Sequence, residues 1–197
     1  MYSEILLNKL ISQGNGILFA SAAVKAGISR MQLSKFVANG LLERTGRGIY
    51  VKAGEIGDEL FTLQQKAKKI TYSHETALFL HGMADRTPFR YSVTVPSGYK
   101  PSEGIKDACK LYYIKPELAD MGRTELPSGM GHMVFAYDAE RTMCDVLRSR
   151  NRMDAQLFTE ALKNYTSRKD MNLNRLAQYA QKLGIYKLLR QYLEVLL

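Results

Sequence analysis

The sequence has few of the features that mark secreted, membrane-spanning or zinc-binding proteins. Its two cysteines, Cys109 and Cys144, lie far apart and form no CxxC pair, so we expect buried free thiols rather than a disulfide framework or a zinc site. No apolar run is long enough to cross a bilayer, and Met1–Leu10 lacks the basic start and long apolar core of a secretion signal. There is no low-complexity tract or internal repeat. We therefore expect a cytoplasmic protein without a membrane partner.

Positive charge is concentrated near the N-terminus. The chain has 197 residues and a net charge of +9, and its length allows two small domains or one medium one. The first 52 residues carry seven basic residues against two acidic ones, which is over half of the excess. Because each basic side chain placed on a phosphate releases counterions, this concentration predicts a nucleic-acid partner. The basic residues are Lys9, Lys25, Arg30, Lys35, Arg44, Arg47 and Lys52.

The segment from residue 21 to residue 52 has helix caps and glycine turns at the positions typical of a winged helix-turn-helix. Ser21 is a predicted N-cap for a first short helix, which Gly27 ends in a left-handed conformation. Ser29 is a predicted N-cap for a second helix, which Gly40 ends. Two short helices joined by so tight a turn are typical of proteins that bind the DNA major groove.

The second helix has distinct apolar and polar faces. Leu33, Phe36 and Val37 fall on one stripe, so the side chains around Arg30 and Ser34 point away from it. We expect this polar face to meet the base edges of DNA. The candidate DNA-binding residues on this helix and just before it are Lys25, Ser29, Arg30, Met31, Gln32, Ser34 and Lys35.

A hairpin follows these two helices. Residues 41–45 and 48–52 are predicted strands around the turn Gly46-Arg47, which places Arg47 at the tip and Arg44 at the end of the first strand. Both arginines suit a phosphate or a minor groove. A three-helix bundle with a hairpin that merely packs against it is the alternative.

The rest of the chain predicts an α+β fold in three parts. Residues 1–54 form the winged helix-turn-helix domain, residues 55–70 a bridging helix, and residues 71–197 a C-terminal α+β domain. In the bridging helix, Ile56, Leu60, Leu63 and Ala67 define the apolar stripe over residues 55–69. The C-terminal domain has a small sheet and a terminal helical cluster, with strands over 91–95, 110–114 and 133–137 and helices over 74–81, from 138, and over 154–167, 172–183 and 185–197.

The three histidines raise the possibility of a metal site. His74 and His81 are seven residues apart and share a helix face, but His74-Glu75 is not followed by the second histidine of a zincin helix. No third ligand, at His132 or elsewhere, has a recognisable spacing. Hydrogen-bonded structural histidines are therefore favoured, and we expect neither a metal nor a cofactor.

Three acidic residues cluster at the start of one C-terminal helix. Asp138, Glu140 and Asp145 suggest acid-base or magnesium chemistry. The structural alternative is that Asp138 caps the helix, Glu140 lies in its first turn, and Arg141 forms an i, i+4 ion pair with Asp145. No nucleophile or phosphate loop accompanies the cluster, which favours the structural role.

The C-terminal helices also carry many basic residues. A solvated helix surface is the simpler explanation, and a second nucleic-acid surface is the alternative. From Thr71 onward the chain has 18 basic against 14 acidic residues, an excess too small to decide between them. The set is Arg148, Arg150, Arg152, Lys163, Arg168, Lys169, Arg175, Lys182, Lys187 and Arg190.

Together, the winged helix and two later motifs resemble the AbiEi antitoxins of abortive-infection systems. The first motif is Ser73–Met83, SHETALFLHGM, followed by Asp85–Pro88, and the second is Tyr137–Asp145, YDAERTMCD. Within these motifs the resemblance points to a set of residues in the C-terminal domain. They are Ser73, His74, Thr76, His81, Asp138, Arg141 and Asp145.

The resemblance implies a bacterial, cytoplasmic antitoxin of a type IV toxin-antitoxin system that provides phage resistance. The N-terminal domain would repress the shared operon by binding inverted repeats in double-stranded DNA. The C-terminal domain would counteract a nucleotidyltransferase toxin without a stable complex. We expect a monomer in solution, several protomers on DNA, and no enzymatic activity. The alternative is a nucleic-acid-processing enzyme whose winged helix recruits substrate.

Overall fold

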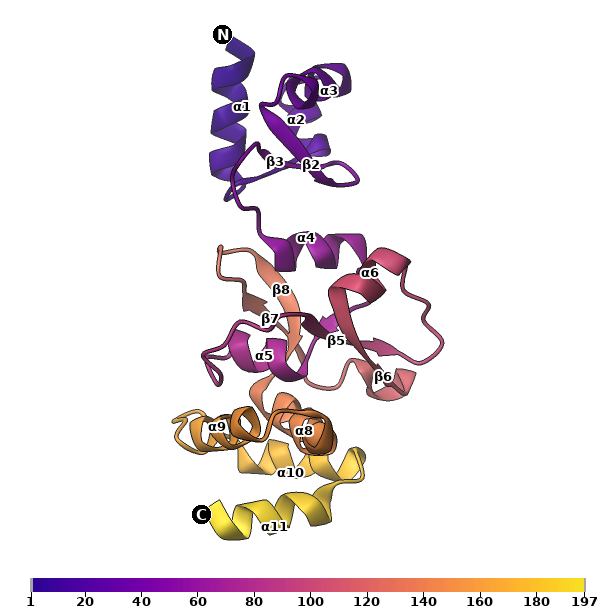
Figure 1. Cartoon of the computed structure of the whole chain (residues 1–197), viewed down its shortest axis with the longest axis vertical. Coiled ribbons are helices and arrows are strands. Elements are labelled where there is room, and N and C mark those ends of the chain that lie inside the picture. The colour runs from indigo at the N-terminus through magenta and orange to yellow at the C-terminus, as the bar shows by residue number, and fades with distance from the viewer. Residues whose placement is uncertain (1, 197) are drawn as a thin grey trace. The chain divides into compact units, whose positions relative to one another are not determined.

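The computed structural model describes residues 2–196 and divides into two compact units (Figure 1). The first unit comprises Met1–Lys68 and Pro127–Val134. The second comprises Lys69–Leu126 and Phe135–Leu197. The chain therefore leaves the first unit after residue 68 and contributes one later segment to it. The fold is α+β, as the sequence predicts, with a small sheet in each unit.

The first unit is a winged helix-turn-helix followed by one more helix. Its sheet has the order β1-β3-β2, and both pairings are antiparallel. A β-bulge between Arg44 and Gly46 interrupts the register of the β2–β3 hairpin. The elements are α1 (Tyr2–Gln13), β1 (Ile17–Phe19), α2 (Ala20–Lys25), α3 (Arg30–Ala38), β2 (Leu42–Gly46), β3 (Ile49–Lys52) and α4 (Glu59–Lys66).

Side chains pack on both sides of this sheet because strand residues alternate between its faces. One core joins the helices to Leu18 and Leu42, and it includes Leu33 and Phe36 of α3. A second, smaller core consists of Ile17, Ile49 and Val51, with Phe19 and Phe61 packed against it. Since Phe61 belongs to α4, this helix covers apolar residues of the winged helix itself.

Two predicted helix starts in this unit are wrong. Ser21 is not an N-cap, because α2 already begins at Ala20 and Phe19 occupies the cap position. The helix predicted over residues 55–69 is shorter and runs from Glu59 to Lys66, with Asp58 as its N-cap. Ile56 is accordingly not part of a buried stripe and is 83% exposed. Asp58 caps α4 by accepting a hydrogen bond from the Phe61 N–H at 2.9 Å.

The second unit is built on a five-stranded mixed sheet of order β6-β5-β4-β8-β7. Strand β4 runs antiparallel to β5 and parallel to β8, while β5 and β6 are parallel. The central strand β4 is only two residues long, and the sequence analysis missed it. The strands are β4 (Thr71–Tyr72), β5 (Tyr91–Pro96), β6 (Cys109–Ile114), β7 (Arg123–Pro127) and β8 (Met133–Tyr137).

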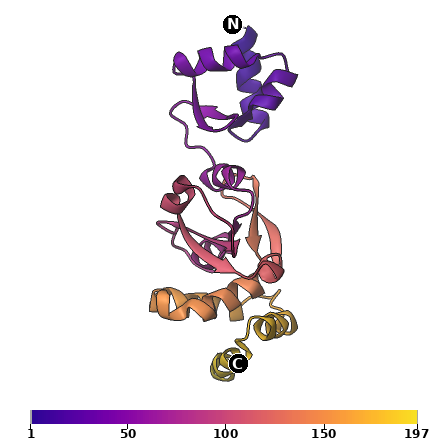
Figure 2. The same cartoon turned by 90° about the vertical axis from the view of Figure 1, so that its right-hand side faces the viewer.

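Helices α8 to α11 pack on one another in the second unit (Figure 2). Their core contains Met143, Leu147 and Leu176, and it continues to Leu78 of α5. The predicted helices over 138–149 and in the terminal cluster are confirmed, and both cysteines are buried free thiols as expected. The helices are α5 (His74–Leu80), α6 (Glu103–Ala108), α7 (Pro116–Ala119), α8 (Ala139–Ser149), η1 (Arg150–Arg152), α9 (Ala155–Thr166), α10 (Leu173–Lys182) and α11 (Tyr186–Leu196).

Within residues 2–196, no helix combines the length and the apolar character needed to cross a membrane.

Candidate functional site

Helix α3 begins with a complete capping box. The Ser29 hydroxyl oxygen accepts a hydrogen bond from the Gln32 backbone N–H at 3.2 Å, and the Gln32 side-chain oxygen accepts from the Ser29 N–H at 2.8 Å. Both bonds satisfy donors that a helix start otherwise leaves unpaired. The capping box therefore fixes the first turn of α3, where a recognition helix reads DNA.

The outer face of α3 is exposed and basic. Arg30, Met31 and Lys35 are exposed, whereas Leu33 and Phe36 of the same helix are buried. Met31 is an apolar side chain with 70% of its surface in solvent. This division matches the predicted stripe.

The remaining candidate DNA-binding residues on the helices lie beside this face. Ser34 is exposed, and its hydroxyl donates to the Arg30 carbonyl at 3.1 Å. Lys25 and Ser29 are exposed, whereas Gln32 is half-buried because its side chain is part of the capping box. The Gln32 side chain therefore stabilises the start of α3.

The wing presents the two predicted arginines. Arg44 and Arg47 are both exposed on the β2–β3 hairpin. The Arg44 Nε–H donates to the Gly46 carbonyl at 3.1 Å, which holds its stem along the bulge. Gly48 has φ = 71°, a left-handed conformation that lets the chain reverse directly after Arg47. Arg47 therefore stands at the tip.

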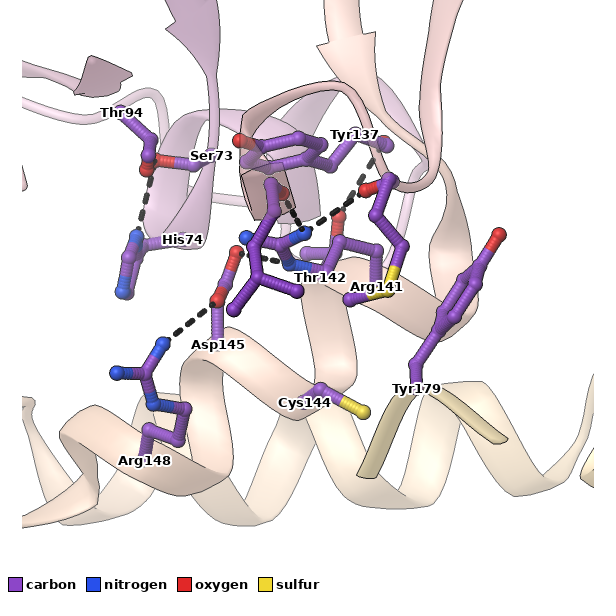
Figure 3. A network of polar contacts seen from close by, with 12 residues as sticks. Ser73, His74, Thr94, Tyr137, Arg141, Thr142, Cys144, Asp145, Arg148 and Tyr179 are labelled. Carbon is purple, nitrogen blue, oxygen red and sulfur yellow. Dashed lines mark hydrogen bonds and ion pairs between the residues drawn. The ribbon is translucent and has the colours of Figure 1, made fainter. Parts of the chain in front are cut away.

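In the second unit, Arg141 is the centre of a buried polar network (Figure 3). Its Nη1 donates to the carbonyls of Leu118 and Met121 at 2.9 and 2.8 Å, and its Nε donates to Asp145 at 3.1 Å. The guanidinium also lies over the Tyr137 ring, 4.2 Å from the ring centroid. The predicted i, i+4 pair of Arg141 and Asp145 is therefore confirmed, and it holds α8 to the segment around α7.

Asp145 has a second basic neighbour on its own helix. Arg148 Nη1 lies 3.8 Å from the other Asp145 oxygen, a longer and looser ion pair. Burial raises the pKa of the Asp145 carboxyl, and the guanidiniums of Arg141 and Arg148 act against this rise. The two arginines thus offset the cost of burying a carboxylate.

His74 sits at the opposite side of the network (Figure 3). The Thr94 hydroxyl donates to the Ser73 oxygen at 2.8 Å, and the Ser73 hydroxyl oxygen is hydrogen-bonded to His74 Nδ1 at 2.9 Å. On the other edge of the ring, His74 Nε2 is hydrogen-bonded to the Ser149 hydroxyl oxygen at 3.0 Å. Burial, followed by the charges of Lys110, Arg148 and Arg141, holds the pKa of His74 well below 6.5, so the ring is neutral at pH 7.

The backbone of His74 is unusual. Its φ of 47° is in the left-handed region, which side chains other than glycine rarely adopt. The ring stacks on Tyr112 with centroids 3.4 Å apart and planes 11° from parallel. Stacking on Tyr112 and hydrogen bonds at both ring nitrogens therefore hold a conformation that costs free energy locally.

The other residues highlighted by the AbiEi resemblance have separate partners. The Thr76 hydroxyl oxygen accepts from the Ser92 N–H at 2.8 Å, joining α5 to β5. His81 Nε2 donates to the Tyr137 carbonyl at 2.8 Å. His74 and His81 thus have different partners, and among residues 2–196 no three His, Cys, Asp or Glu side chains are grouped to hold a metal ion.

The acidic cluster at the start of α8 has the structural contacts that the sequence predicts. Asp138 accepts from the Arg141 backbone N–H at 2.8 Å as the N-cap, and its second oxygen accepts from the Tyr179 hydroxyl at 3.0 Å. Glu140 accepts from the Asn172 N–H at 3.1 Å and lies 3.7 Å from Arg175. Each carboxylate therefore connects α8 to a neighbouring helix.

The structure also brings together residues that the sequence analysis did not connect. A pocket of about 580 Å³ is lined by His74, Arg141 and Asp145 together with residues of β6 and η1. Arg148 and Arg152 were recognised only as members of a basic set, and Tyr112 and Asn151 were not singled out. Their lack of a shared sequence motif explains the omission, because they meet only through the packing of β6 beside the end of α8.

Comparisons with known proteins bear on both units. Residues 6–51 match the family described as "Transcriptional regulator, AbiEi antitoxin", and no curated protein matches the chain. The fold is similar to the crystal structure of the RV2827C protein from Mycobacterium tuberculosis, with a TM-score of 0.62 and 14% identity over 89% of this chain and 70% of that chain. At this identity the similarity concerns the fold alone. The segment Ser73–Met83 lies outside the matched residues, so its resemblance stays a prediction. Residues 6–51 are thus similar to the family described as "Transcriptional regulator, AbiEi antitoxin".

Proposed function

We propose that the protein represses transcription of its own operon and serves as the antitoxin of a type IV toxin-antitoxin system in the bacterial cytoplasm. The first unit binds inverted repeats in the promoter. The second unit counteracts a nucleotidyltransferase toxin without a stable complex, as the antitoxin of an abortive-infection system that provides phage resistance. DNA binding by the first unit is the part on which the structure bears most directly.

The exposed face of α3 carries this proposal. It displays Arg30 and Lys35 beside Met31, on a helix whose start is fixed by the Ser29 capping box. An arginine of a recognition helix can form two hydrogen bonds with guanine, and a methionine contributes apolar contacts to base edges. The match of residues 6–51 to a family of transcriptional regulators supports the same conclusion.

Several protomers are needed for tight repression. A single small basic module binds non-specific DNA with a Kd of about 10⁻⁴ to 10⁻⁶ M at physiological salt. Two such modules on paired repeats gain affinity by avidity, provided that the spacing allows both to engage. A protein that is monomeric in solution and multiple on its operator satisfies this requirement.

Titration of labelled promoter DNA with the full chain tests the proposal. Arg30→Ala is expected to weaken operator binding by about 1 to 3 kcal/mol. It is also expected to reduce the difference in affinity between operator and scrambled DNA. Arg47→Ala removes a phosphate or minor-groove contact, so it is expected to weaken both DNAs alike and to reduce the slope of log K against log salt by about 1.

Lys9→Ala is the matched control, because it removes one exposed charge from α1 rather than from α3 or the wing. Its operator affinity is expected to stay close to that of the wild type. Equal losses from Lys9→Ala, Arg30→Ala and Arg47→Ala would indicate a general charge effect and would contradict recognition by α3.

Antitoxin activity needs a separate test in cells. The Arg30→Ala variant, expressed from an unrelated promoter, is expected to rescue cells from the toxin as the wild type does, since the second unit is intact. Failure of a well-folded variant to rescue would make DNA binding part of the antitoxin mechanism.

The enzymatic alternative predicts a different result at Asp138. Asparagine keeps an N-cap oxygen for the Arg141 N–H and a partner for Tyr179, but it removes the carboxylate. Asp138→Asn is therefore expected to preserve fold and rescue. A loss of rescue with an unchanged thermal midpoint would favour chemistry at this position.

A further inference from the structure

The second unit contains a pocket with a strongly positive lining. The pocket, of about 580 Å³, lies between β6 and the end of α8 with η1, and it is lined by His74, Thr94, Leu111, Tyr112, Tyr113, Ile114, Arg141, Asp145, Arg148, Ser149, Asn151 and Arg152. This volume is within the range of sites that hold small ligands. The lining contains three arginines, Arg141, Arg148 and Arg152, and only one carboxylate, that of Asp145.

Arg141 leaves one donor group unused. Its side chain is fully buried, and its Nη2 has no hydrogen-bond partner, although Nε and Nη1 are satisfied. A buried guanidinium nitrogen without an acceptor is costly, because the protein has removed it from water without replacing the lost hydrogen bonds. Figure 3 shows the guanidinium lying between Tyr137 and Asp145.

The other two arginines also have donors available. Arg148 is 3.8 Å from Asp145, too far for a hydrogen bond, and its side chain is 37% exposed. Arg152 is exposed on η1, within the lining. Lys110, whose charge acts on His74, is instead paired with Glu75 at 2.8 Å. Arg148 and Arg152 are therefore the cations of this lining that remain for a ligand, since Arg141 is paired with Asp145.

Neutral donors complete the lining. Ser149 ends α8, Asn151 lies in η1, and His74 is fixed by its left-handed backbone and by stacking on Tyr112. His74 Nε2 is hydrogen-bonded to the Ser149 hydroxyl oxygen at 3.0 Å. Hydroxyl, amide and guanidinium donors from separate elements thus converge on one space.

We propose that this pocket binds the phosphate group of a small phosphomonoester. A phosphate dianion accepts from several donors at once, and the planar guanidinium matches two of its oxygens. The single carboxylate is already neutralised by Arg141, so the pocket keeps an excess of positive charge. A free phosphate ion and a nucleoside 5′-monophosphate share this chemistry. The site is separate from the DNA surface of the first unit and does not depend on the function proposed for that unit.

Calorimetric titration of the full chain in a phosphate-free buffer tests the site. Inorganic phosphate and adenosine 5′-monophosphate are the probes, and adenosine is the probe without phosphate. We expect saturable binding of one phosphate or one monophosphate per chain and no binding of adenosine. Tighter binding of the monophosphate identifies a nucleotide as the preferred source, and equal binding identifies phosphate alone, either of which supports the proposal.

Substitutions locate the binding. Arg152→Gln and Arg148→Gln each remove a charged donor from the lining. Each is expected to raise the Kd for phosphate about tenfold. Arg150→Gln is the matched control, because Arg150 is in the same η1 turn but outside the lining, and its Kd is expected to stay near the wild-type value. Thermal midpoints close to that of the wild type show that each variant is folded. Arg152→Gln is the variant least prone to unfold, because Arg152 is exposed.

Three outcomes would overturn the proposal. The first is no saturable binding of either phosphate probe to the wild type, and the second is adenosine binding as tightly as its monophosphate. The third is an equal loss in the Arg152→Gln and Arg150→Gln variants, which would indicate a diffuse charge effect rather than a pocket.

Discussion

At the scale of single residues, the second unit depends on how Arg141 is buried. Its guanidinium donates to two backbone carbonyls and to Asp145, so the side chain joins α8 to the turn after α7. Removing such a buried charge leaves its partners unpaired, which is more costly than the net value of the contacts. The surrounding backbone must also approach closely, and Gly122 provides this approach.

Gly122→Ala is expected to destabilise the second unit by about 3 kcal/mol. A Cβ at this position would lie 2.6 Å from the Arg141 Cβ, and the residue has φ = 76°. Gly98→Ala is the control, since Gly98 has φ = 88° but open space around it, so only the backbone cost of about 1 kcal/mol is expected. Urea unfolding of both variants measures the difference, and equal losses would show that the Arg141 contact does not matter.

At the scale of elements, the N-cap residue of α3 has a structural role and is also proposed to bind DNA. Ser29 caps the helix, and it is also among the proposed DNA contacts. A helix start attracts anions through its free N–H groups, so the same feature favours a DNA phosphate there. The two roles can be separated by changing the charge of the cap.

Ser29→Asp is expected to keep the stability of the protein while weakening operator binding. Aspartate is as good an N-cap as serine, but its charge repels phosphate. Ser29→Ala is expected to show the opposite balance, with a loss of about 1 kcal/mol in stability and a smaller loss of affinity. Thermal unfolding and DNA titration on the same samples separate the effects. Undiminished affinity in Ser29→Asp would place the helix start away from phosphate.

At the scale of the whole molecule, two histidines connect stability to pH. Burial lowers the pKa of both His74 and His81 from 6.5. Above pH 6.5 both histidines are neutral whether the chain is folded or not, so their titration does not change the free energy of unfolding. Below it the unfolded chain binds protons that the folded chain does not, and the free energy of unfolding falls until pH reaches the lower, folded pKa values.

We therefore expect the stability of the protein to decrease as pH falls from about 6.5 to 5.5. In the His74→Asn variant this decrease is expected to be smaller, because asparagine tolerates the left-handed backbone and does not titrate. Urea unfolding at a series of pH values measures the slope. An unchanged slope in the variant would show that His74 is not the group responsible.

The first unit makes a further prediction about where the chain can be divided. Residues 1–54 include the winged helix but lack Phe61, which packs against the core of Ile17, Ile49 and Val51. We expect a fragment of residues 1–68 to unfold at a higher temperature than one of residues 1–54. Equal thermal midpoints of the two fragments would show that α4 adds nothing to the stability of the winged helix. Pro127–Val134 also belongs to this unit and supplies His132, which pairs with Asp58 at 2.8 Å.

The sequence by itself determined the local features of both units. Gly27 sets the end of α2, Ser29 and Gly40 set the bounds of α3, and Asp138 sets the start of α8. Caps and left-handed turns depend on residues close in the chain. The positions of β5, β6 and β8 followed from short runs of β-branched and aromatic residues. The concentration of basic residues in the first 52 positions likewise predicted a nucleic-acid partner without any structure.

Tertiary structure alone decided the features that depend on distant residues. Strand β4 has two residues and no sequence signal of its own, and it forms because β5 and β8 pair with it on either side. The neutral state of His74 depends on burial and on the charges of Lys110, Arg148 and Arg141, all distant from it in the chain. The arginine-lined pocket forms only where β6 meets the end of α8. Such contacts lie beyond the range over which local spacing carries information, and the packing of whole elements sets them.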